Sequence, residues 1–269
     1  MKKRLRLVPL LVLVMVVASS CIWPAFRYGP ERTGFNSAET TLGVANVGSL
    51  NRKWTAQTGT ATTSSPAVAQ GVLYISTSTG ELRAFDAAGS TGCSGTPKTC
   101  TPLWTAVLGG FSMSSPAVSG GVVYVGANIP VYADPFDVLD GVFYAFDATG
   151  TTGCSGTPKV CTPLWRADSD QAGASSPVVV GGRVYLGMDG LQAFDAAGSV
   201  NCAGTPTGCT PIWTGGTGGF TVSSPALAGN VAYQLTGGTL EAFNVDGTTG
   251  CSGTPTVCTP IWRATWGSF

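Results

Sequence analysis

Cysteine is the residue type in this chain whose spacing most suggests chemistry. Eight of the nine cysteines form four pairs with six residues between the members: Cys93/Cys100, Cys154/Cys161, Cys202/Cys209 and Cys251/Cys258. A zinc site, a redox centre and a disulfide are the alternatives for such a pair. Since the chain has no histidine and the spacing is not the C-x-x-C of redox proteins, zinc and redox chemistry are disfavoured. The pairs are predicted to be local disulfides.

Repeated serines and aspartates are the next candidates. Ser-Ser-Pro recurs from Ser64, Ser114, Ser175 and Ser223, and Ala-Phe-Asp or Ala-Phe-Asn recurs from Ala84, Ala145, Ala193 and Ala242. A catalytic serine needs one base, and the lack of histidine excludes Ser-His-Asp triads and His-ligated zinc or haem. Because the groups recur in every repeat, we expect the serines to form a structural turn or hydroxyl ladder and the acids to cap turns.

A cluster of acids that does not recur lies in ANIPVYADPFDVLDG, residues 127–141. Asp134, Asp137 and Asp140, with Tyr132 and Phe136 beside them, could bind Ca²⁺ or a sugar, because hard cations prefer clustered oxygens. The spacing is not that of an EF-hand, and acids in a solvated loop commonly serve solubility alone. Both interpretations stay open.

The N-terminus has the pattern of an export signal. Lys2, Lys3, Arg4 and Arg6 precede the short apolar stretch 7–18, which is typical of a signal peptide over residues 1–20. Ala18-Ser19-Ser20-Cys21 resembles the lipobox of bacterial lipoproteins, which implies acylation of Cys21 and explains the unpaired ninth cysteine. The alternative is an ordinary secretory signal cut near Ser20.

The charge that remains after the leader argues against a nucleic-acid partner. Removing Lys2, Lys3, Arg4 and Arg6 leaves 10 basic against 14 acidic residues, a net charge of about −4. A nucleic-acid-binding domain would need a basic patch. Together with the export signal and the lipobox at Cys21, this charge leads us to expect a lipid-anchored protein on the extracytoplasmic side of a cell membrane, with no nucleic-acid partner.

A repeat of about 48–50 residues organises the rest of the chain, with one interval of 61 residues that contains the insertion. Each unit predicts four short strands, as in 65–69, 71–76, 82–87 and 102–106, separated by glycine turns. A four-stranded antiparallel unit repeated in this way is typical of a β-propeller blade. The fold class is therefore all-β, with cysteine hairpins between the third and fourth strands of each blade.

These residues resemble the PQQ-like repeats of quinoprotein-type propellers. The match is Ala84-Phe85-Asp86, Gly89 and Trp104, followed by the corresponding residues of the later repeats, with Asn244 in place of the last aspartate. The resemblance implies that a tryptophan of each outer strand docks between blades: Trp54, Trp104, Trp165, Trp213 and Trp262. Residues 21–49 are similar to the family's lead-in segment, and 50–269 contain the repeats.

The number of predicted outer strands exceeds the number of predicted sets of inner strands. Five tryptophan-bearing outer strands accompany only four sets of inner strands, because 50–56 adds an outer strand before the first blade. We expect an incomplete ring, an open arc of four blades plus one strand with at least one exposed edge. A closed four-bladed ring and a truncated gene product are the alternatives.

The sequence favours a non-catalytic, membrane-anchored propeller that binds an envelope protein or glycan without a cofactor. Such a protein resembles in type the PQQ-repeat lipoprotein of the outer-membrane barrel-assembly machinery. The alternatives are a quinoprotein dehydrogenase, for which the resemblance implies PQQ and Ca²⁺, and a fragment of a larger propeller. No two cysteines are adjacent, although a disulfide of adjacent cysteines often lies beside the quinone in those enzymes.

Overall fold

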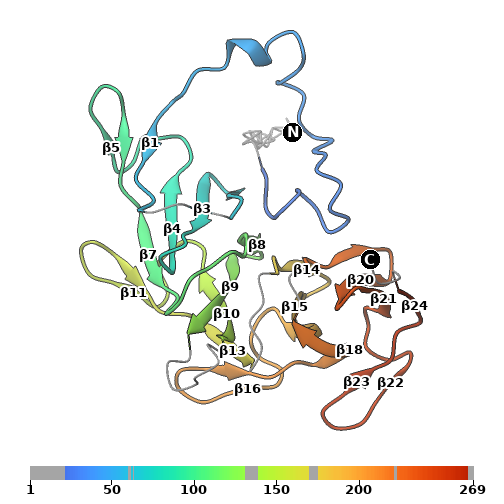
Figure 1. The fold of residues 1–269 in the computed structure, drawn as a ribbon. Coiled ribbons are helices and arrows are strands. Elements are labelled where there is room, and N and C mark those ends of the chain that lie inside the picture. The colour runs from blue at the N-terminus through green and yellow to red at the C-terminus, as the bar shows by residue number, and fades with distance from the viewer. Residues whose placement is uncertain are drawn as a thin grey trace, which may run out of the picture.

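The computed structural model describes residues 22–59, 62, 64–130, 139–169, 175–220 and 223–265. Cys21, Asp134 and Asp137 lie outside this part of the chain, as does the predicted signal peptide. The described residues form β-sheets arranged as an arc of four blades (Figure 1). The predicted all-β propeller with four blades and an additional N-terminal outer strand is confirmed.

Each blade contains four strand segments in up-and-down order, from the axis to the rim. The strands of the blades are, in chain order, β2 (Ala67–Ala69), β3 (Val72–Ser76), β4 (Glu81–Asp86) and β7 (Trp104–Val107) in blade 1; β8 (Ala117–Ser119), β9 (Val122–Pro130), β10 (Leu139–Asp147) and β13 (Trp165–Ser169) in blade 2; β14 (Val178–Val180), β15 (Arg183–Asp195) and β18 (Trp213–Phe220) in blade 3; and β19 (Ala226–Ala228), β20 (Val231–Thr236), β21 (Thr239–Asn244) and β24 (Trp262–Thr265) in blade 4.

Blade 3 has the same plan, although one long element replaces two strands. The first part of β15 pairs with β14, at Tyr185↔Val178, and the last part pairs with β18, at Ala193↔Trp213. Gly190 between them has a φ of +78° and a position where a Cβ would lie 2.4 Å from the Gly215 carbonyl oxygen. A tight turn at this glycine lets β15 supply both the second and the third strand of the blade.

The apolar core lies between blades rather than within one. Leu82, Trp104, Val123 and Phe146 belong to one buried cluster that joins blades 1 and 2, and two similar clusters join blades 2 to 3 and 3 to 4. A single four-stranded sheet cannot bury both of its faces, so stacking of neighbours supplies the burial that stabilises each blade.

The cysteine hairpins extend the sheets across the blade boundaries. Their strands are β5 (Cys93–Ser94), β6 (Thr99–Cys100), β11 (Cys154–Ser155), β12 (Val160–Cys161), β16 (Cys202–Ala203), β17 (Gly208–Cys209), β22 (Cys251–Ser252) and β23 (Val257–Cys258). All four predicted disulfides are confirmed. In each hairpin the second strand pairs in parallel with the outer strand of the preceding blade, as β12 does with β7.

This pairing adds a contact between blades to the predicted local closure of the hairpins. The disulfide closes the hairpin locally, at Cys154↔Cys161 for example, but the hairpin itself bonds to a neighbour. The residue after each of the first four docking tryptophans donates its N–H to a hairpin carbonyl, as Thr105 does to Lys159 and Arg166 does to Thr207, at 3.0 Å in both cases. Hence the hairpins join successive blades.

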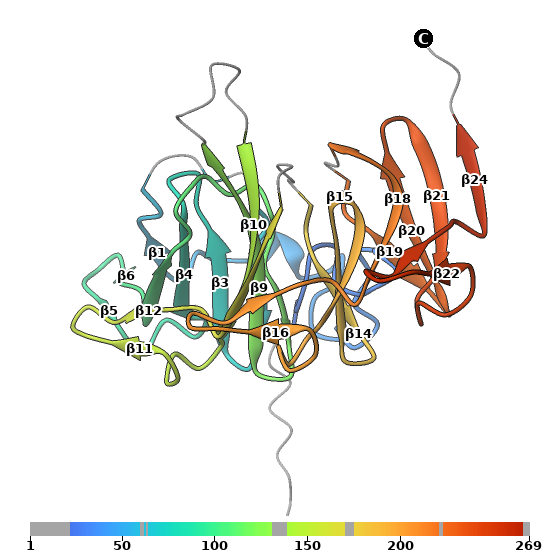
Figure 2. The same ribbon diagram turned by 90° about the horizontal axis from the view of Figure 1, so that it is seen from below.

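The insertion in the second repeat lengthens a hairpin instead of forming a separate loop. Its described residues continue β9 and β10, which stay paired at Asn128↔Gly141 and Ile129↔Asp140. In Figure 2 the paired ends of these two strands, called the β9–β10 projection below, lie on the side opposite the cysteine hairpins. A bridge between Phe111 and Asn128 supports the base of this projection.

The lead-in crosses the inner ends of the blades before it reaches the rim (Figure 1). Trp23 forms a two-way backbone bridge with Val68 of blade 1, the Pro24 carbonyl accepts from Val118 of blade 2, and the Pro30 carbonyl accepts from Leu227 of blade 4. An exposed stretch with one short 3₁₀ helix, η1 (Val47–Ser49), then leads to β1 (Thr55–Ala56). None of the helices in the described part of the chain could span a membrane.

Candidate functional site

Three of the docking tryptophans, Trp54, Trp104 and Trp165, share one environment at the blade junctions, whereas the buried Trp213 Nε1 has no hydrogen-bond partner among the described residues. The Trp104 indole N–H donates to the Ala148 carbonyl of the next blade at 3.3 Å, and Trp165 donates to Ala196 at the same distance. The tyrosine of the second strand shares that carbonyl, since the Tyr74 hydroxyl donates to Ala148 at 2.9 Å and Tyr124 donates to Ala196 at 2.8 Å. Burial raises the pKa of Tyr74 to about 12, so this hydroxyl stays a donor.

A glycine of the next blade shapes each tryptophan pocket. At Gly150, φ is +66° and a Cβ would lie 2.2 Å from the Trp104 Cδ1. Gly89, Gly198 and Gly247 have the same relation to Trp54, Trp165 and Trp213, with 2.2–2.3 Å to Cδ1. The glycine of the repeat is therefore required both by the left-handed backbone and by the ring packed against it.

The repeated serines form the predicted ladder across the blades. The backbone N–H of Ser65 donates to the Ser115 hydroxyl, that of Ser115 to Ser176, and that of Ser176 to Ser224, each at 2.9 Å. The first serine of each pair bonds within its own blade, as Ser175 does in accepting from Gly187 N at 2.9 Å. These hydroxyls hold backbone in place, and the structural interpretation of the serines is confirmed.

The repeated aspartates cap the turns that follow the third strands, as predicted. The Asp147 carboxylate accepts from the backbone N–H groups of Thr149, Thr151 and Thr152. Burial works against ionisation of Asp147, but hydrogen bonds from Thr152, Thr151 and Thr149 outweigh it and hold its pKa below the usual range. In blade 4, Asn244 accepts from Asp246 N, and Asp246 caps Thr248.

A buried arginine fixes the lead-in to the inner ends of two blades. The Arg32 guanidinium donates to the carbonyls of Pro225 at 3.0 Å, and of Ser176 and Pro177 at 2.9 Å. It also donates to Phe26 O within the lead-in at 2.6 Å. Burial lowers the pKa of Arg32 to about 10. The sequence interpretation missed this residue, because nothing in the pattern of the lead-in marks one basic residue as buried.

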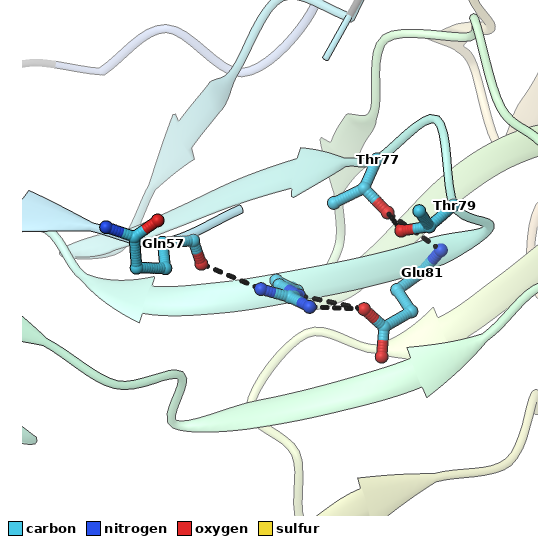
Figure 3. A network of polar contacts seen from close by, with 5 residues as sticks. Gln57, Thr77, Thr79 and Glu81 are labelled. Atoms are coloured by element: carbon cyan, nitrogen blue, oxygen red, sulfur yellow. Dashed lines mark hydrogen bonds and ion pairs between the residues drawn. The ribbon is translucent and has the colours of Figure 1, made fainter. Parts of the chain in front are cut away.

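One repeat position differs in every blade and faces the preceding blade. It holds Arg83, Tyr144, Gln192 and Glu241, two residues before the Phe of each repeat. In blade 1, Arg83 donates to Gln57 O at 2.7 Å and pairs with Glu81; Figure 3 labels these two partners. Beside it lies a groove of about 790 Å³ whose polar lining includes Glu81, Arg83 and Lys159. The Tyr144 hydroxyl makes the equivalent contact in blade 2, donating to Leu108 O at 2.8 Å.

Glu241 is the unusual member of that position. Its side chain is fully buried, and neither carboxylate oxygen has a hydrogen-bond partner, although Arg263 Nη2 lies 3.3 Å from Oε1. Room for it comes from the glycines of β18, since a Cβ on Gly216 would lie 3.0 Å from Glu241 Oε2. Arg263 thus ties the last strand to the core of blade 4.

The predicted metal residues are not brought together in the part that the structure describes. Asp140 lies in β10 opposite Ile129, while Asp134 and Asp137 fall outside the described residues. Asp168 pairs with Arg166 at 3.1 Å. No group of three or more acidic or cysteine side chains suited to a metal ion occurs among residues with described positions. The calcium site stays a prediction.

The last blade presents an outer strand that differs from the others. β24 is exposed along its whole length, and Trp262 has 44% of its surface exposed against 1–2% for Trp104, Trp165 and Trp213. Trp262 still packs on Tyr233 of its own blade, with ring centroids 6.0 Å apart. Over the described ranges, no strand pairing joins blade 4 to blade 1.

Sequence comparison assigns the repeats to a family. The family model described as outer membrane protein assembly factor BamB matches residues 46–197, which is more than half of the chain. The chain belongs to this family. No curated protein sequence matched. The four disulfides and the family together indicate an extracytoplasmic protein.

Comparison with solved structures gave matches at low sequence identity. Quinohemoprotein alcohol dehydrogenase from Comamonas testosteroni superposes with a TM-score of 0.61 and 16% identity, over 91% of this chain and 41% of the enzyme. BamB from Moraxella catarrhalis gives 0.35 and 16%, over 72% and 61% of the two chains. The designed protein Ika8 gives 0.43 and 11%, over 67% and 45%. The chain spans less than half the length of the dehydrogenase and of the designed protein.

Proposed function

We propose that the protein is a non-catalytic, lipid-anchored propeller that binds an envelope protein through the β9–β10 projection. The observation that carries this proposal is the division of roles within the repeat. Groups that recur in every blade bond to the backbone or pack between blades, whereas the lengthened β9–β10 pairing, out to Pro130↔Leu139, belongs to the insertion that one repeat alone carries (Figure 2). Binding residues in proteins are concentrated on such extensions of a rigid scaffold.

The repeated polar groups support a scaffold because their hydrogen-bonding capacity is used within the fold. The serine hydroxyls accept neighbouring N–H groups, and Asp147 accepts three backbone N–H groups. A catalytic group needs a reacting partner in place of such fixed contacts. The name of the matched family, outer membrane protein assembly factor, agrees with a role in protein assembly.

The residues present do not fit a quinone cofactor at the propeller axis. The lead-in covers this region, with Trp23 bridged to Val68 and Arg32 bonded to carbonyls of blades 3 and 4. A quinone with Ca²⁺ would need clustered carboxylates, and the described residues near the axis offer backbone carbonyls to Arg32 instead. We therefore derive no dehydrogenase step for this chain.

Anchoring through Cys21 would place the propeller close to the membrane. Cys21 is followed directly by Ile22 and by Trp23, the residue bridged to blade 1. A lipid on Cys21 would thus have a tether of one residue before the fold begins. One acyl chain binds membranes only marginally, so the processed cysteine must carry more than one for stable attachment.

Site-specific photo-crosslinking in cells tests the proposed binding surface. A photoreactive amino acid at Asp140, on the projection, should give a cross-linked envelope protein that mass spectrometry identifies. The same amino acid at Val200, which is 50% exposed on the cysteine-hairpin side, is the matched control and should not. Equal cross-linking at both positions, or at neither, contradicts the proposal.

A shortened variant separates binding from folding. Replacing 130–139 by Asn-Gly joins Ile129 to Asp140, which are already register partners, through a turn that suits a two-residue hairpin. Cross-linking from position 140 should be lost with little change in melting temperature. Reduction of a dye by the purified protein with PQQ, Ca²⁺ and an alcohol would overturn the non-catalytic assignment.

A further inference from the structure

The outer strand of blade 4 repeats the sequence of an outer strand that is already covered. Trp165-Arg166-Ala167 begins β13, and Trp262-Arg263-Ala264 begins β24. In β13, the backbone N–H of Arg166 donates to Thr207 O of the next cysteine hairpin at 3.0 Å, and the indole N–H of Trp165 donates to Ala196 O of the next blade at 3.3 Å. The part of the chain with described positions supplies neither acceptor to β24.

Four observed junctions define what the exposed edge should contact. Each supplies a glycine against the indole ring and a cysteine hairpin beside the outer strand. At three of them a carbonyl after the turn-capping residue accepts the indole N–H, and at the fourth the equivalent Val245 carbonyl accepts from the Tyr185 hydroxyl instead. Trp54, Trp104, Trp165 and Trp213 lie 6.0–6.4 Å, centroid to centroid, from a phenylalanine of the following blade. An occupant of the β24 edge therefore needs the same features.

Blade 1 has this surface, and only a weakly supported strand covers it. β1 has two residues, and its sheet contains no strands other than β6 and β5. Trp54 is only partly buried. The Ala87 carbonyl accepts the indole N–H of Trp54 at 3.2 Å, whereas the Ala148 and Ala196 carbonyls each accept a tyrosine hydroxyl as well.

The two ends of the serine ladder are complementary in the same way. In the described chain it starts at Ser65, which donates to Ser115, and finishes at Ser224, which accepts from Ser176. At each junction, a backbone N–H of the earlier blade meets a hydroxyl of the later one. An N–H of Ser224 directed to a Ser65 hydroxyl would continue the series.

From these observations we infer that a second copy of this chain docks its blade 1 onto the β24 edge of the first, with β1 displaced, and that the first copy does the same in return. Trp262 and Tyr233 take the Ala87 carbonyl of the partner copy, and Arg263 N–H takes the Lys98 carbonyl. Two reciprocal contacts close the pair by a two-fold rotation, so that neither edge stays exposed. The inference is independent of the proposed projection site.

Displacing β1 from blade 1 breaks few contacts within one copy of the chain. Residues 36–53, which precede and lead to β1, are almost all exposed, so moving them breaks few contacts. β24 is a stronger occupant than β1 because four residue pairs with β21 hold it in a complete blade. The indole that enters the pocket is therefore already oriented.

The superposition on a larger propeller supports the shape that this pair requires. Nearly the whole chain, 91%, fits within 41% of the dehydrogenase, at a TM-score of 0.61. The four blades thus have the arrangement of a segment of a larger ring, and in Figure 1 the lead-in, rather than a further blade, lies on the side between blades 4 and 1. A second four-bladed segment is the smallest addition from this chain that could fill the opening.

Sedimentation of the exported full-length protein, with detergent if it is acylated, measures the association. We expect a dimer for the wild type and a monomer for Trp262→Ala. Trp54→Ala should dimerise about tenfold more tightly, equivalent to 1.4 kcal/mol, because it removes the competitor for the pocket. Phe35→Ala is the matched control, an exposed aromatic of the lead-in (69% exposed) whose loss should change nothing.

The other outcomes overturn the inference. A wild type that stays monomeric shows that no second copy docks. A dimer that Trp262→Ala leaves intact uses another surface, and a dimer that Trp54→Ala does not strengthen forms without displacement of β1. The projection can still cross-link its partner in each case, so a failure here is distinguishable from a failure of the proposed function. Because Trp262 is already partly exposed, thermal melting of Trp262→Ala verifies that the variant is folded.

Discussion

Single residues in this fold are set by the junctions between blades. Gly150 combines a φ of +66° with a Cβ position 2.2 Å from Trp104, so both backbone and packing exclude a side chain. Gly120 has a φ of +58° with nothing within 4 Å of its Cβ position. The two glycines separate the cost of a left-handed residue from the cost of a clash.

Gly150→Ala should therefore destabilise the protein more than Gly120→Ala. Placing alanine in the left-handed conformation costs about 1–2 kcal/mol. The free energy of unfolding should fall by this amount in both variants. Overpacking against Trp104 should add about 1–3 kcal/mol at Gly150 alone. Urea unfolding followed by tryptophan fluorescence measures the difference, and equal effects would show that the Trp104 pocket adapts without cost.

The capping aspartates predict how stability changes in acid. The pKa of Asp147 is lowered in the folded protein, so its hydrogen bonds stabilise the fold at neutral pH. This contribution should be lost as the pH falls below the ordinary carboxyl pKa of about 4 and toward the lowered folded-state pKa. Asp86 and Asp195 have lowered pKa values as well, so the effect should repeat along the chain.

Asp147→Asn tests this assignment. The amide keeps one acceptor oxygen, as Asn244 does in blade 4, so we expect a loss of about 1 kcal/mol at pH 7. The difference in stability between the variant and the wild type should shrink as the pH falls below about 4, because protonation of Asp147 also weakens the wild-type cap. A difference that does not vary with pH would contradict the assigned cap. Thermal melting across this range is the measurement.

At the scale of elements, the lead-in acts as a strap across the inner strands. Backbone bonds join it to blades 1, 2 and 4, and Arg32 adds the carbonyls of blades 3 and 4. These carbonyls are buried with the arginine, so removal of the guanidinium would leave them without their donor. Buried acceptors without a donor are costly.

Arg32→Ala should destabilise the protein by about 2–4 kcal/mol, since several charge-assisted hydrogen bonds are lost together. Arg32→Lys should recover only part of this loss, because an ammonium group cannot reproduce the planar fork of donors. Arg52, an exposed arginine later in the lead-in, gives the control Arg52→Ala. Urea unfolding and proteolysis of the N-terminal segment are the measurements, and equal effects at Arg32 and Arg52 would refute the strap.

The cysteine hairpins show how an element can be predicted while its partner is not. Their local spacing indicated the disulfides correctly, because closure of a short hairpin depends only on nearby residues. Their parallel pairing with the preceding blade was missed. That contact joins residues about 50 positions apart, such as Thr105 and Val160, and no feature of the hairpin sequence indicates it.

At the scale of the molecule, blades bury their cores only against one another. Each apolar cluster contains residues of two neighbours, so stability in such a repeat array depends on the intrinsic stability of the units and on the contacts between them. The faces of blades 1 and 4 that have no neighbouring blade are therefore the ones that a binding partner would stabilise most. In this chain those faces are β24 with Trp262 and the two-residue strand β1.

The amino-acid sequence by itself determined the repeat, the four-stranded unit, the disulfide pairs, and the structural roles of the serines and aspartates. These features depend on local spacing and on recurrence, which any single repeat displays. Only the tertiary structure decided where the lead-in lies, that Arg32 and Glu241 are buried, that the hairpins join neighbouring blades, and which tryptophan lies exposed. The physical reason is that these properties depend on what packs against a residue from a distant part of the chain, and the same Trp-Arg-Ala sequence is buried in β13 and exposed in β24.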